Sequence, residues 1–250
     1  MKRETRKVSD REGMEFSAVI LAGGRSSRMG SDKAWLPFNG RTLLARQIEL
    51  VRELAPTEVF ISGRADTDYA SCGGRVLTDR FPEAGPLAGI ERALNACASP
   101  LLLVLAVDMP HLRAEFLGRL LASCAGEAGV IPCHQGRIEP LVAFYPRASW
   151  RLLVNLIEER SPVFPSAAKT AGGKGLPVAG EHSSNSPSVT RFAELCVEVG
   201  LARFHALSAG DARCCSNWNS PADLPQLPDL RTTPAVGHVP APHLQPASTP

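Results

Sequence analysis

The 250-residue sequence has no strong excess of charge of either sign and no long apolar run. It contains 27 Lys and Arg against 25 Asp and Glu, a net charge of +2, which argues against a nucleic-acid binder that works by bulk positive charge. The longest apolar run, PLLLVLAV, is far shorter than the roughly 20 residues that a membrane-spanning helix needs. The opening segment MKRETRKVSDREGMEF lacks the apolar core of a secretory signal. We therefore predict a cytoplasmic protein without membrane or nucleic-acid partners, in which recognition of anions is local.

Cysteine and histidine patterns that build disulfides or metal sites are also missing. The seven cysteines are an odd number and contain no Cys-x-x-Cys pair, and the adjacent Cys214 and Cys215 do not have a spacing typical of a disulfide. We expect reduced thiols, as in a cytosolic protein, and no zinc site is supported. The histidines have no ligand-like spacing; His111 is expected near the site, either exposed or in a supporting role.

What the sequence does contain is an alternation of apolar runs and helical patterns, which is typical of βαβ units and a mostly parallel sheet. With 44% hydrophobic residues, the chain can bury one sizeable core. Thr42, which follows an Asn39-Gly40 turn, is the expected N-cap of the first helix. Helices are predicted in LLARQIELVRELA (with Leu44, Ile48, Val51 and Ala55 on its apolar face), GPLAGIERALNAC, AEFLGRLLASC and WRLLVNLIEER, and strands in FSAVIL, EVFISG, RVLTD, PLLLVLAVD, GVIPC and LVAFYP.

The predicted organisation is one Rossmann-like α/β domain with less regular segments around it. Residues 1–15 are expected to be flexible and residues 16–224 to form the domain. Residues 161–188 are rich in Pro, Gly, Ser and Ala without an apolar period, which predicts a disordered insertion, and TRFAELCVEVG then resumes the fold. Residues 225–250 are Pro-rich and aperiodic, which predicts a disordered tail.

The stretch VILAGGRSSRMGSDKA, residues 19–34, reads as a strand that leads into a flexible basic loop. Such a loop brings backbone N–H groups and positive charge to an anion. It is not a Walker A loop, because GSDKA has no Lys-Ser or Lys-Thr after the glycine. GGRSSRMG also does not fit the Gly-x-Gly-x-x-Gly fingerprint of dinucleotide-binding folds.

LAGGRSSRMGSDKA resembles the signature of the MobA-like nucleotidyltransferases. Further segments agree in the order that this family shows: VLTDRFPEAGPLAGI, LAVDMPHL, GRIEPLVAFYP and NWNSPADL, the last with Ser220 where the family has threonine. The resemblance covers roughly residues 16–224 and is interrupted by the insertion. It implies a mostly parallel sheet flanked by helices, of the nucleotide-diphospho-sugar transferase type. It also implies attack by a phosphate on the α-phosphorus of a nucleoside triphosphate, with release of pyrophosphate.

This chemistry makes few demands on acid–base residues. A phosphate monoester has a second pKa of about 6, so at neutral pH it is already an anionic nucleophile and needs no general base. The site must instead hold two polyanions in line and stabilise the leaving charge. Backbone N–H groups, Lys or Arg side chains and a magnesium ion with oxygen ligands would do this.

Two cations and the glycine loop are the expected phosphate and nucleotide contacts. Arg28 and Lys33 are assigned to the phosphates, and the resemblance places Lys33 near the reacting one. Arg25 is left open between phosphate contact and solvent. The glycines allow backbone to approach the nucleotide, although a tight strand-to-helix turn would use them equally. The loop residues assigned to the nucleotide are Leu21, Ala22, Gly23 and Gly24.

Asp108 follows the most apolar strand, where open α/β sheets bind ligands at the carboxyl ends of their strands. A carboxylate there needs a cation, and Mg²⁺ bound also by phosphate and water is the natural one. An N-cap role ahead of Pro110 is a second reading that can coexist with the first. The resemblance suggests Asn219, with Asn217 behind it, as a neutral partner on the metal or phosphate side; a simple turn is the alternative.

The remaining candidate residues come from the resemblance. In the family that the chain resembles, the positions corresponding to Ser62 and Asp79 contact the nucleotide. The family often has asparagine where this chain has Ser62. Gly85 and Gly89 would allow close approach to the base or ribose, or simply start a helix. Arg137 and Glu139 face either the acceptor or solvent on a surface hairpin.

The expected nucleotide is GTP, because LAGG resembles the guanylyl branch of the family whereas LAAG is found in the cytidylyl branch. The resemblance then implies molybdopterin-bound molybdenum as acceptor, the guanine dinucleotide form of the cofactor as product, and a molybdoenzyme or its chaperone as a further partner. Cytidylyl transfer to the same cofactor and transfer to a sugar or polyol phosphate stay open. A non-catalytic nucleotide-binding regulator also stays open, although the presence of both Lys33 and Asp108 argues against it.

Overall fold

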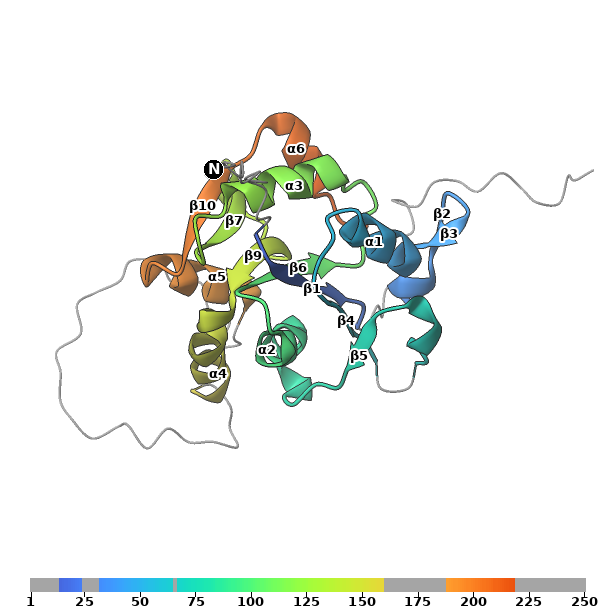
Figure 1. Ribbon diagram of the computed structural model, residues 1–250, viewed down its shortest axis with the longest axis horizontal. Helices are drawn as coiled ribbons and strands as arrows, with labels where there is room; N and C mark the ends of the chain where they lie inside the picture. The colour runs from blue at the N-terminus through green and yellow to red at the C-terminus, as the bar shows by residue number, and fades with distance from the viewer. Residues whose placement is uncertain (1–13, 24–31, 65–66, 160–187, 219–250) are drawn as a thin grey trace, which may run out of the picture.

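The computed structural model describes residues 14–23, 32–64, 67–159 and 188–218, whose main feature is a sheet between two layers of helices (Figure 1). Nearly all residues of the three segments expected to be irregular lie outside the described residues; these segments are 1–15, 161–188 and 225–250. The strand order is β10-β7-β9-β6-β1-β4-β5, and β8 pairs with β7. The strands are β1 (Phe16–Leu21), β4 (Val59–Ser62), β5 (Arg75–Leu77), β6 (Leu101–Ala106), β7 (Gly129–His134), β8 (Arg137–Ile138), β9 (Val142–Pro146) and β10 (Ala202–Ala206).

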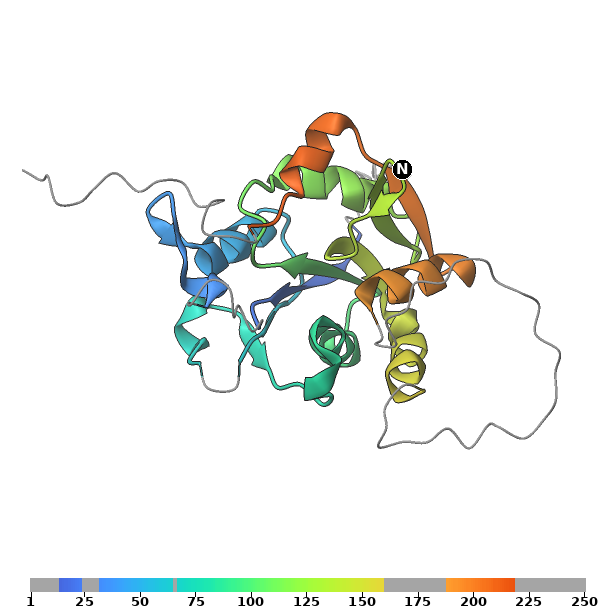
Figure 2. The ribbon, with the colours of Figure 1, turned by 180° about the vertical axis from the view of Figure 1, so that it is seen from behind.

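The helices cover both faces of the sheet (Figures 1 and 2). On one face lie α1 (Leu43–Arg52), α3 (Ala114–Ser123) and α6 (Ala209–Cys214), and on the other α2 (Pro86–Ala96), α4 (Trp150–Glu158) and α5 (Val189–Glu198). Leu102 and Val104 of β6 pack with the second group, while Leu101, Leu103 and Leu105 pack with the first. Both faces of β6 are therefore buried, which explains why this strand is continuously apolar in sequence.

The predicted mostly parallel α/β sheet is confirmed. β1 runs parallel to β4 and β6, β4 to β5, and β10 to β7, whereas β9 is antiparallel to both β6 and β7. Every strand predicted from the sequence is present. β10 and α6 were not predicted, because β10 is an edge strand with largely exposed residues such as Phe204 and therefore has no apolar run. α6 has only six residues, and its main sequence signal is the N-cap Ser208, whose side chain accepts a hydrogen bond from the Asp211 N–H.

Two local signals at the start of α1 are confirmed and one at its end is wrong. Thr42 Oγ1 accepts a hydrogen bond from the Ala45 N–H at 3.2 Å, as expected of an N-cap. Asn39 and Gly40, with φ of 48° and 80°, form the two-residue turn of a hairpin between β2 (Pro37–Phe38) and β3 (Arg41–Thr42). Ala55 does not lie on the helix, because α1 ends at Arg52 and Ala55 is an exposed residue with φ of 53°.

The register of the parallel strands places their carboxyl ends at one edge of the sheet. Leu21 at the end of β1 is paired with Ser62 of β4 and with Ala106 of β6, and Ser62 is paired with Leu77 of β5. The residues that follow these strands therefore emerge side by side. Short 3₁₀ turns lie near both edges: η1 (Lys33–Trp35), η2 (Ala70–Cys72), η3 (Pro82–Ala84) and η4 (Arg147–Ser149).

None of the seven cysteines forms a disulfide, in agreement with the expected reduced thiols. Burial raises the pKa of the Cys97 and Cys124 thiols to about 11 and that of the Cys196 and Cys215 thiols to about 12, which keeps these groups protonated. Within the described residues, no helix combines the length and the apolar character that crossing a membrane requires.

Candidate active site

The carboxyl ends of β1 and β4 are joined beyond the last strand residues. Ser62 O accepts hydrogen bonds from Ala22 N at 2.7 Å and from Gly23 N at 3.0 Å. Leu21, Ala22 and Ser62 are buried, and Gly23 is the first exposed residue after β1. Ala22 and Gly23, which begin the predicted glycine loop after Leu21, therefore lie at the carboxyl edge of the sheet.

The two glycines of the GPLAG segment, Gly85 and Gly89, are favoured at their positions for different physical reasons. A Cβ on Gly89 would lie 2.2 Å from Ser62 Oγ and 2.9 Å from Leu21 Cδ2, so the α2 backbone packs directly on the ends of β1 and β4. Gly85 has φ of 58° and ψ of −135°, a backbone conformation that favours glycine, and a Cβ there would meet nothing within 4 Å. Their predicted approach to a base or ribose stays a prediction.

Ser62 and Asp79, predicted as nucleotide contacts, are brought together by β4 and β5. Ser62 Oγ donates a hydrogen bond to Asp79 Oδ1 at 3.4 Å. Burial raises the pKa of the Asp79 carboxyl, the Ser62 hydrogen bond lowers it, and the charge of Glu91 raises it further. Glu91 is itself fully buried and accepts hydrogen bonds from Trp150 Nε1 at 2.8 Å and Arg80 Nη1 at 3.0 Å. This network holds the segment after β5 against α2 and α4.

Lys33 and Asp108, which are 75 residues apart in the chain, form an ion pair of 2.7 Å between Lys33 Nζ and Asp108 Oδ2. Lys33 Nζ also donates to Trp218 O at 2.6 Å, and Trp218 N donates to Asp108 O at 2.9 Å. The two side chains are 19% and 15% exposed, respectively. The predicted N-cap role of Asp108 is wrong, because α3 begins only at Ala114 and follows Arg113.

A set of contacts that sequence reasoning missed holds Asp32, the residue before Lys33. Asp32 caps η1 by accepting from Ala34 N at 3.0 Å, and Tyr69 OH donates to Asp32 Oδ2 at 3.4 Å. The Tyr69 ring is stacked on Trp35, with the ring centroids 5.8 Å apart. A Cβ at Gly63 would lie only 2.2 Å from Tyr69 Cε2. Gly63 therefore makes room for the tyrosine that positions Asp32.

Trp218 is the second residue that sequence reasoning missed. Its side chain is 4% exposed and packs edge-on against Phe38 at 5.3 Å and His111 at 6.2 Å. His111 is exposed, as one of the expected readings had it. The available signal was the position of Trp218 between Asn217 and Asn219, since an apolar ring within a polar turn indicates an anchor.

A cavity of about 450 Å³ lies next to Asp108, and its lining includes Met109, Arg137, Glu139 and Asn217. Arg137 Nε is 3.1 Å from Glu139 Oε1; burial raises the pKa of the Glu139 carboxyl and the Arg137 charge lowers it. Asn217 Oδ1 is buried and has no hydrogen-bond partner among the described residues. Arg137 and Glu139 thus line a cavity beside the strand end, and their contact with an acceptor stays a prediction.

The oxygen atoms at this edge suit a hard cation better than a transition metal. Asp108 offers a carboxylate and Asn217 a buried amide oxygen that lacks a partner within the described residues. Across that part of the chain, no group of three or more His, Cys, Asp or Glu side chains could hold a metal by itself. An ion here would need phosphate and water oxygens, as Mg²⁺ commonly does. Gly24, Arg25, Arg28 and Asn219 lie outside the described residues.

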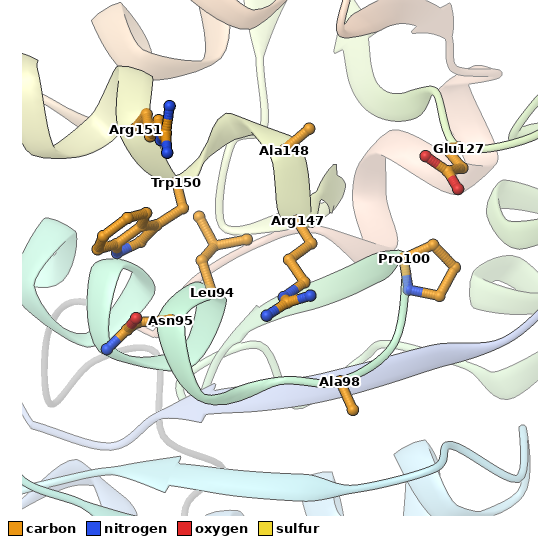
Figure 3. Close-up of a pocket in the computed structure, with 9 residues that line it drawn as sticks. All are labelled: Leu94, Asn95, Ala98, Pro100, Glu127, Arg147, Ala148, Trp150 and Arg151. Atoms are coloured by element: carbon orange, nitrogen blue, oxygen red, sulfur yellow. The ribbon is translucent and has the colours of Figure 1, made fainter.

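A larger hollow of about 690 Å³ lies at the opposite edge of the sheet, beside Pro100, which precedes β6 (Figure 3). Figure 3 shows the charged groups of Arg147, Arg151 and Glu127 apart from one another, with Asn95 and Glu127 on different sides. The polar groups do not converge on one point, so the hollow is a poor candidate for catalysis despite its size.

Comparison with known proteins gives one consistent result. A family profile described as "MobA-like NTP transferase domain" matches residues 18–168. A protein of Opitutus terrae named "Probable molybdenum cofactor guanylyltransferase" is 41% identical over 211 residues, which cover 83% of this chain and 92% of that protein. Among solved structures, "Molybdopterin-guanine dinucleotide biosynthesis protein A" of Archaeoglobus fulgidus has a TM-score of 0.56 at 20% identity and covers 83% of this chain and 94% of its own. "2-C-methyl-D-erythritol 4-phosphate cytidylyltransferase" of Thermus thermophilus has a TM-score of 0.53 at 18% identity and covers 82% of this chain and 93% of its own. At these identities, the two structures support the fold alone.

Proposed function

Because the chain belongs to the MobA-like NTP transferase family, we propose that it transfers GMP from GTP to the terminal phosphate of molybdopterin-bound molybdenum cofactor. The products are pyrophosphate and the guanine dinucleotide form of the cofactor. The Opitutus terrae relative bears the corresponding name over nearly its whole length, which supports the choice of nucleotide and acceptor.

The observation that carries the proposal is the Lys33–Asp108 pair at the carboxyl edge of the sheet. It places a cation and an anion next to the start of the glycine loop, where Ala22 and Gly23 are held against Ser62. Lys33 is assigned to the triphosphate, where a positive charge stabilises the leaving pyrophosphate. The acceptor phosphate is anionic at neutral pH, so no side chain has to act as a general base.

Asp108 is assigned to a magnesium ion, with Asn219 as the second protein ligand. Mg²⁺ would neutralise phosphate charge and align the two substrates when it is bound. Asp108 and Lys33 would have different roles: the carboxylate would hold the divalent ion, and the ammonium group would bind phosphate oxygens. Arg28, from the same basic loop, is assigned to the phosphates as well.

The acceptor is assigned to the cavity that Arg137 and Glu139 line beside Met109. This cavity lies next to the residue that follows Asp108, so a phosphate bound there would be close to the reacting end of the nucleotide. Arg137 offers a positive charge, and Glu139 offers oxygen acceptors for N–H donors of a pterin ring. The nucleotide itself is assigned to Leu21, Ala22, Gly23, Gly24, Ser62, Asp79 and Gly85.

Pyrophosphate release tests the proposal directly. The purified full-length chain is incubated with Mg²⁺, with GTP or CTP, and with molybdopterin-bound cofactor or a sugar phosphate as acceptor. We expect turnover with GTP and the molybdenum cofactor, and loss of turnover in Asp108→Asn. Arg147→Ala, in the hollow at the opposite edge of the sheet, is the matched control and should be fully active. Turnover with CTP, or with a sugar phosphate alone, would show a different transferase; binding of GTP without turnover would favour a regulator.

A further inference from the structure

The connection that carries Asp108 from β6 to α3 is held by hydrogen bonds from outside it. Gln47 Nε2 donates to Met109 O at 2.7 Å and lies 3.5 Å from Val107 O. Between these two, Asp108 O accepts from Trp218 N at 2.9 Å. Three consecutive carbonyl groups therefore have external donors, and one side chain, Gln47, contacts the backbone on both sides of Asp108.

Gln47 comes from α1, an element that contributes none of the predicted site residues. Its side chain is fully buried, so the amide is fixed between the helix and the connection. The preceding residue, Arg46, donates from Nη2 to Leu112 O at 2.7 Å and holds the far end of the same connection. α1 thus fixes the segment around Asp108 at two points.

A glutamine at this position stabilises the connection through the N–H end of its amide but is unfavourable at the oxygen end. Gln47 Oε1 is buried and has no hydrogen-bond partner among the described residues, which is unfavourable for the folded state. A methionine has a similar length and would avoid that unsatisfied oxygen. What methionine cannot supply is the N–H donor that reaches Met109 O and Val107 O.

We propose that Gln47 is a positioning residue for Asp108: its amide fixes the backbone around the carboxylate and so sets the orientation in which Asp108 meets a metal ion and phosphate oxygens. This inference rests on the metal role proposed above for Asp108. Groups that orient metal ligands from behind typically change metal affinity or activity by about 10–100-fold. Replacing Gln47 should therefore weaken metal binding without contacting the metal.

The test measures binding of Mn²⁺ to the full-length protein in the presence of GTP, with free Mn²⁺ followed by electron paramagnetic resonance. Gln47→Met removes the donor and the unsatisfied oxygen together. Gln47→Glu keeps the shape of the side chain and is the second variant. Ser99→Ala is the control, because the buried Ser17–Ser99 hydrogen bond of 3.0 Å lies at the other end of β1 and β6. Thermal unfolding is recorded for every variant.

We expect Gln47→Met to fold and to bind Mn²⁺ about tenfold more weakly, while Ser99→Ala binds it normally even where its thermal stability falls as much. Binding within twofold of the unchanged protein would overturn the inference. So would equal weakening in Ser99→Ala, or failure of both Gln47 variants to fold, since either result would make the amide a structural group only. Asp108→Asn distinguishes failure of this inference from failure of the proposed function: normal Mn²⁺ binding in that variant would refute the proposed metal role of Asp108 itself.

Discussion

Replacing Gly89 with alanine sets two opposite effects against each other. A Cβ at this position would lie 2.2 Å from Ser62 Oγ, 2.7 Å from Ser62 Cβ and 2.9 Å from Leu21 Cδ2. Overpacking of this kind costs about 1–3 kcal/mol, whereas alanine is favoured over glycine inside a helix by about 1 kcal/mol. The difference predicts a loss in the free energy of unfolding of up to about 2 kcal/mol.

The same substitution should weaken GTP binding, because the displaced residue is Ser62. Its Oγ donates to Asp79, and its carbonyl oxygen accepts from the N–H groups of Ala22 and Gly23. Moving Ser62 would therefore disturb both the glycine loop and Asp79. We expect the Kd for GTP to rise about tenfold, equivalent to about 1.4 kcal/mol. Calorimetric titration with Mg²⁺ and GTP, together with urea unfolding of the same preparation, measures both effects.

Gly118→Ala is the matched control for this prediction. Gly118 lies in α3, and a Cβ there meets nothing within 4 Å, so alanine should stabilise the protein by about 1 kcal/mol and leave GTP binding unchanged. Adding Ser62→Gly to Gly89→Ala removes both contacts with Ser62 and should restore part of the lost stability. The reasoning fails if Gly89→Ala stabilises the protein as much as Gly118→Ala and binds GTP as tightly as before.

Three further predictions concern single charges. Lys33→Met should lower kcat by about 10²–10³-fold in the pyrophosphate assay, and unchanged turnover would remove Lys33 from the phosphate site. Because burial raises the pKa of Asp79, its contribution to stability is present below the unfolded pKa and is lost as pH rises through the folded one. Asp79→Asn should accordingly gain stability relative to the unchanged protein between pH 4 and pH 7 in urea unfolding; an equal difference at both pH values would contradict this. Glu139→Gln should raise the acceptor KM about tenfold, as loss of a charged hydrogen-bond partner does, and leave the GTP KM unchanged; an unchanged acceptor KM would argue against the assigned cavity.

The central sheet and the place of Asp108 could be predicted from the sequence for a simple physical reason. A strand that is covered on both faces must be apolar throughout, and PLLLVLAV is the one long run of this kind. The polar residue directly after such a strand emerges at the carboxyl edge of a parallel sheet, as Asp108 does. The short apolar run of β1 and the periodic apolar faces of α1 and α2 are equally local signals.

The contacts that complete the site could not be predicted, because they join segments far apart in the chain. Lys33 meets Trp218 O across 185 residues, and nothing in the composition of either segment indicates the other. Gln47 lies on a helix with a regular apolar face, so its position gave no reason to connect it with Asp108. The direction of β9 depends on which strands it pairs with, and the pairing is decided by the packing of the whole sheet.

The partial burial of the Lys33–Asp108 ion pair couples the two charges to each other. A carboxylate that is 15% exposed and an ammonium group that is 19% exposed would each be unfavourable without a partner of opposite charge. Lys33 and Asp108 compensate each other at 2.7 Å. Under the roles proposed above, phosphate oxygens would replace the carboxylate at Lys33, and a divalent ion would replace the lysine at Asp108. The two exchanges would be coupled at Asp108, because its partly buried carboxylate would lose its cationic partner if Lys33 turned to phosphate before the ion was bound.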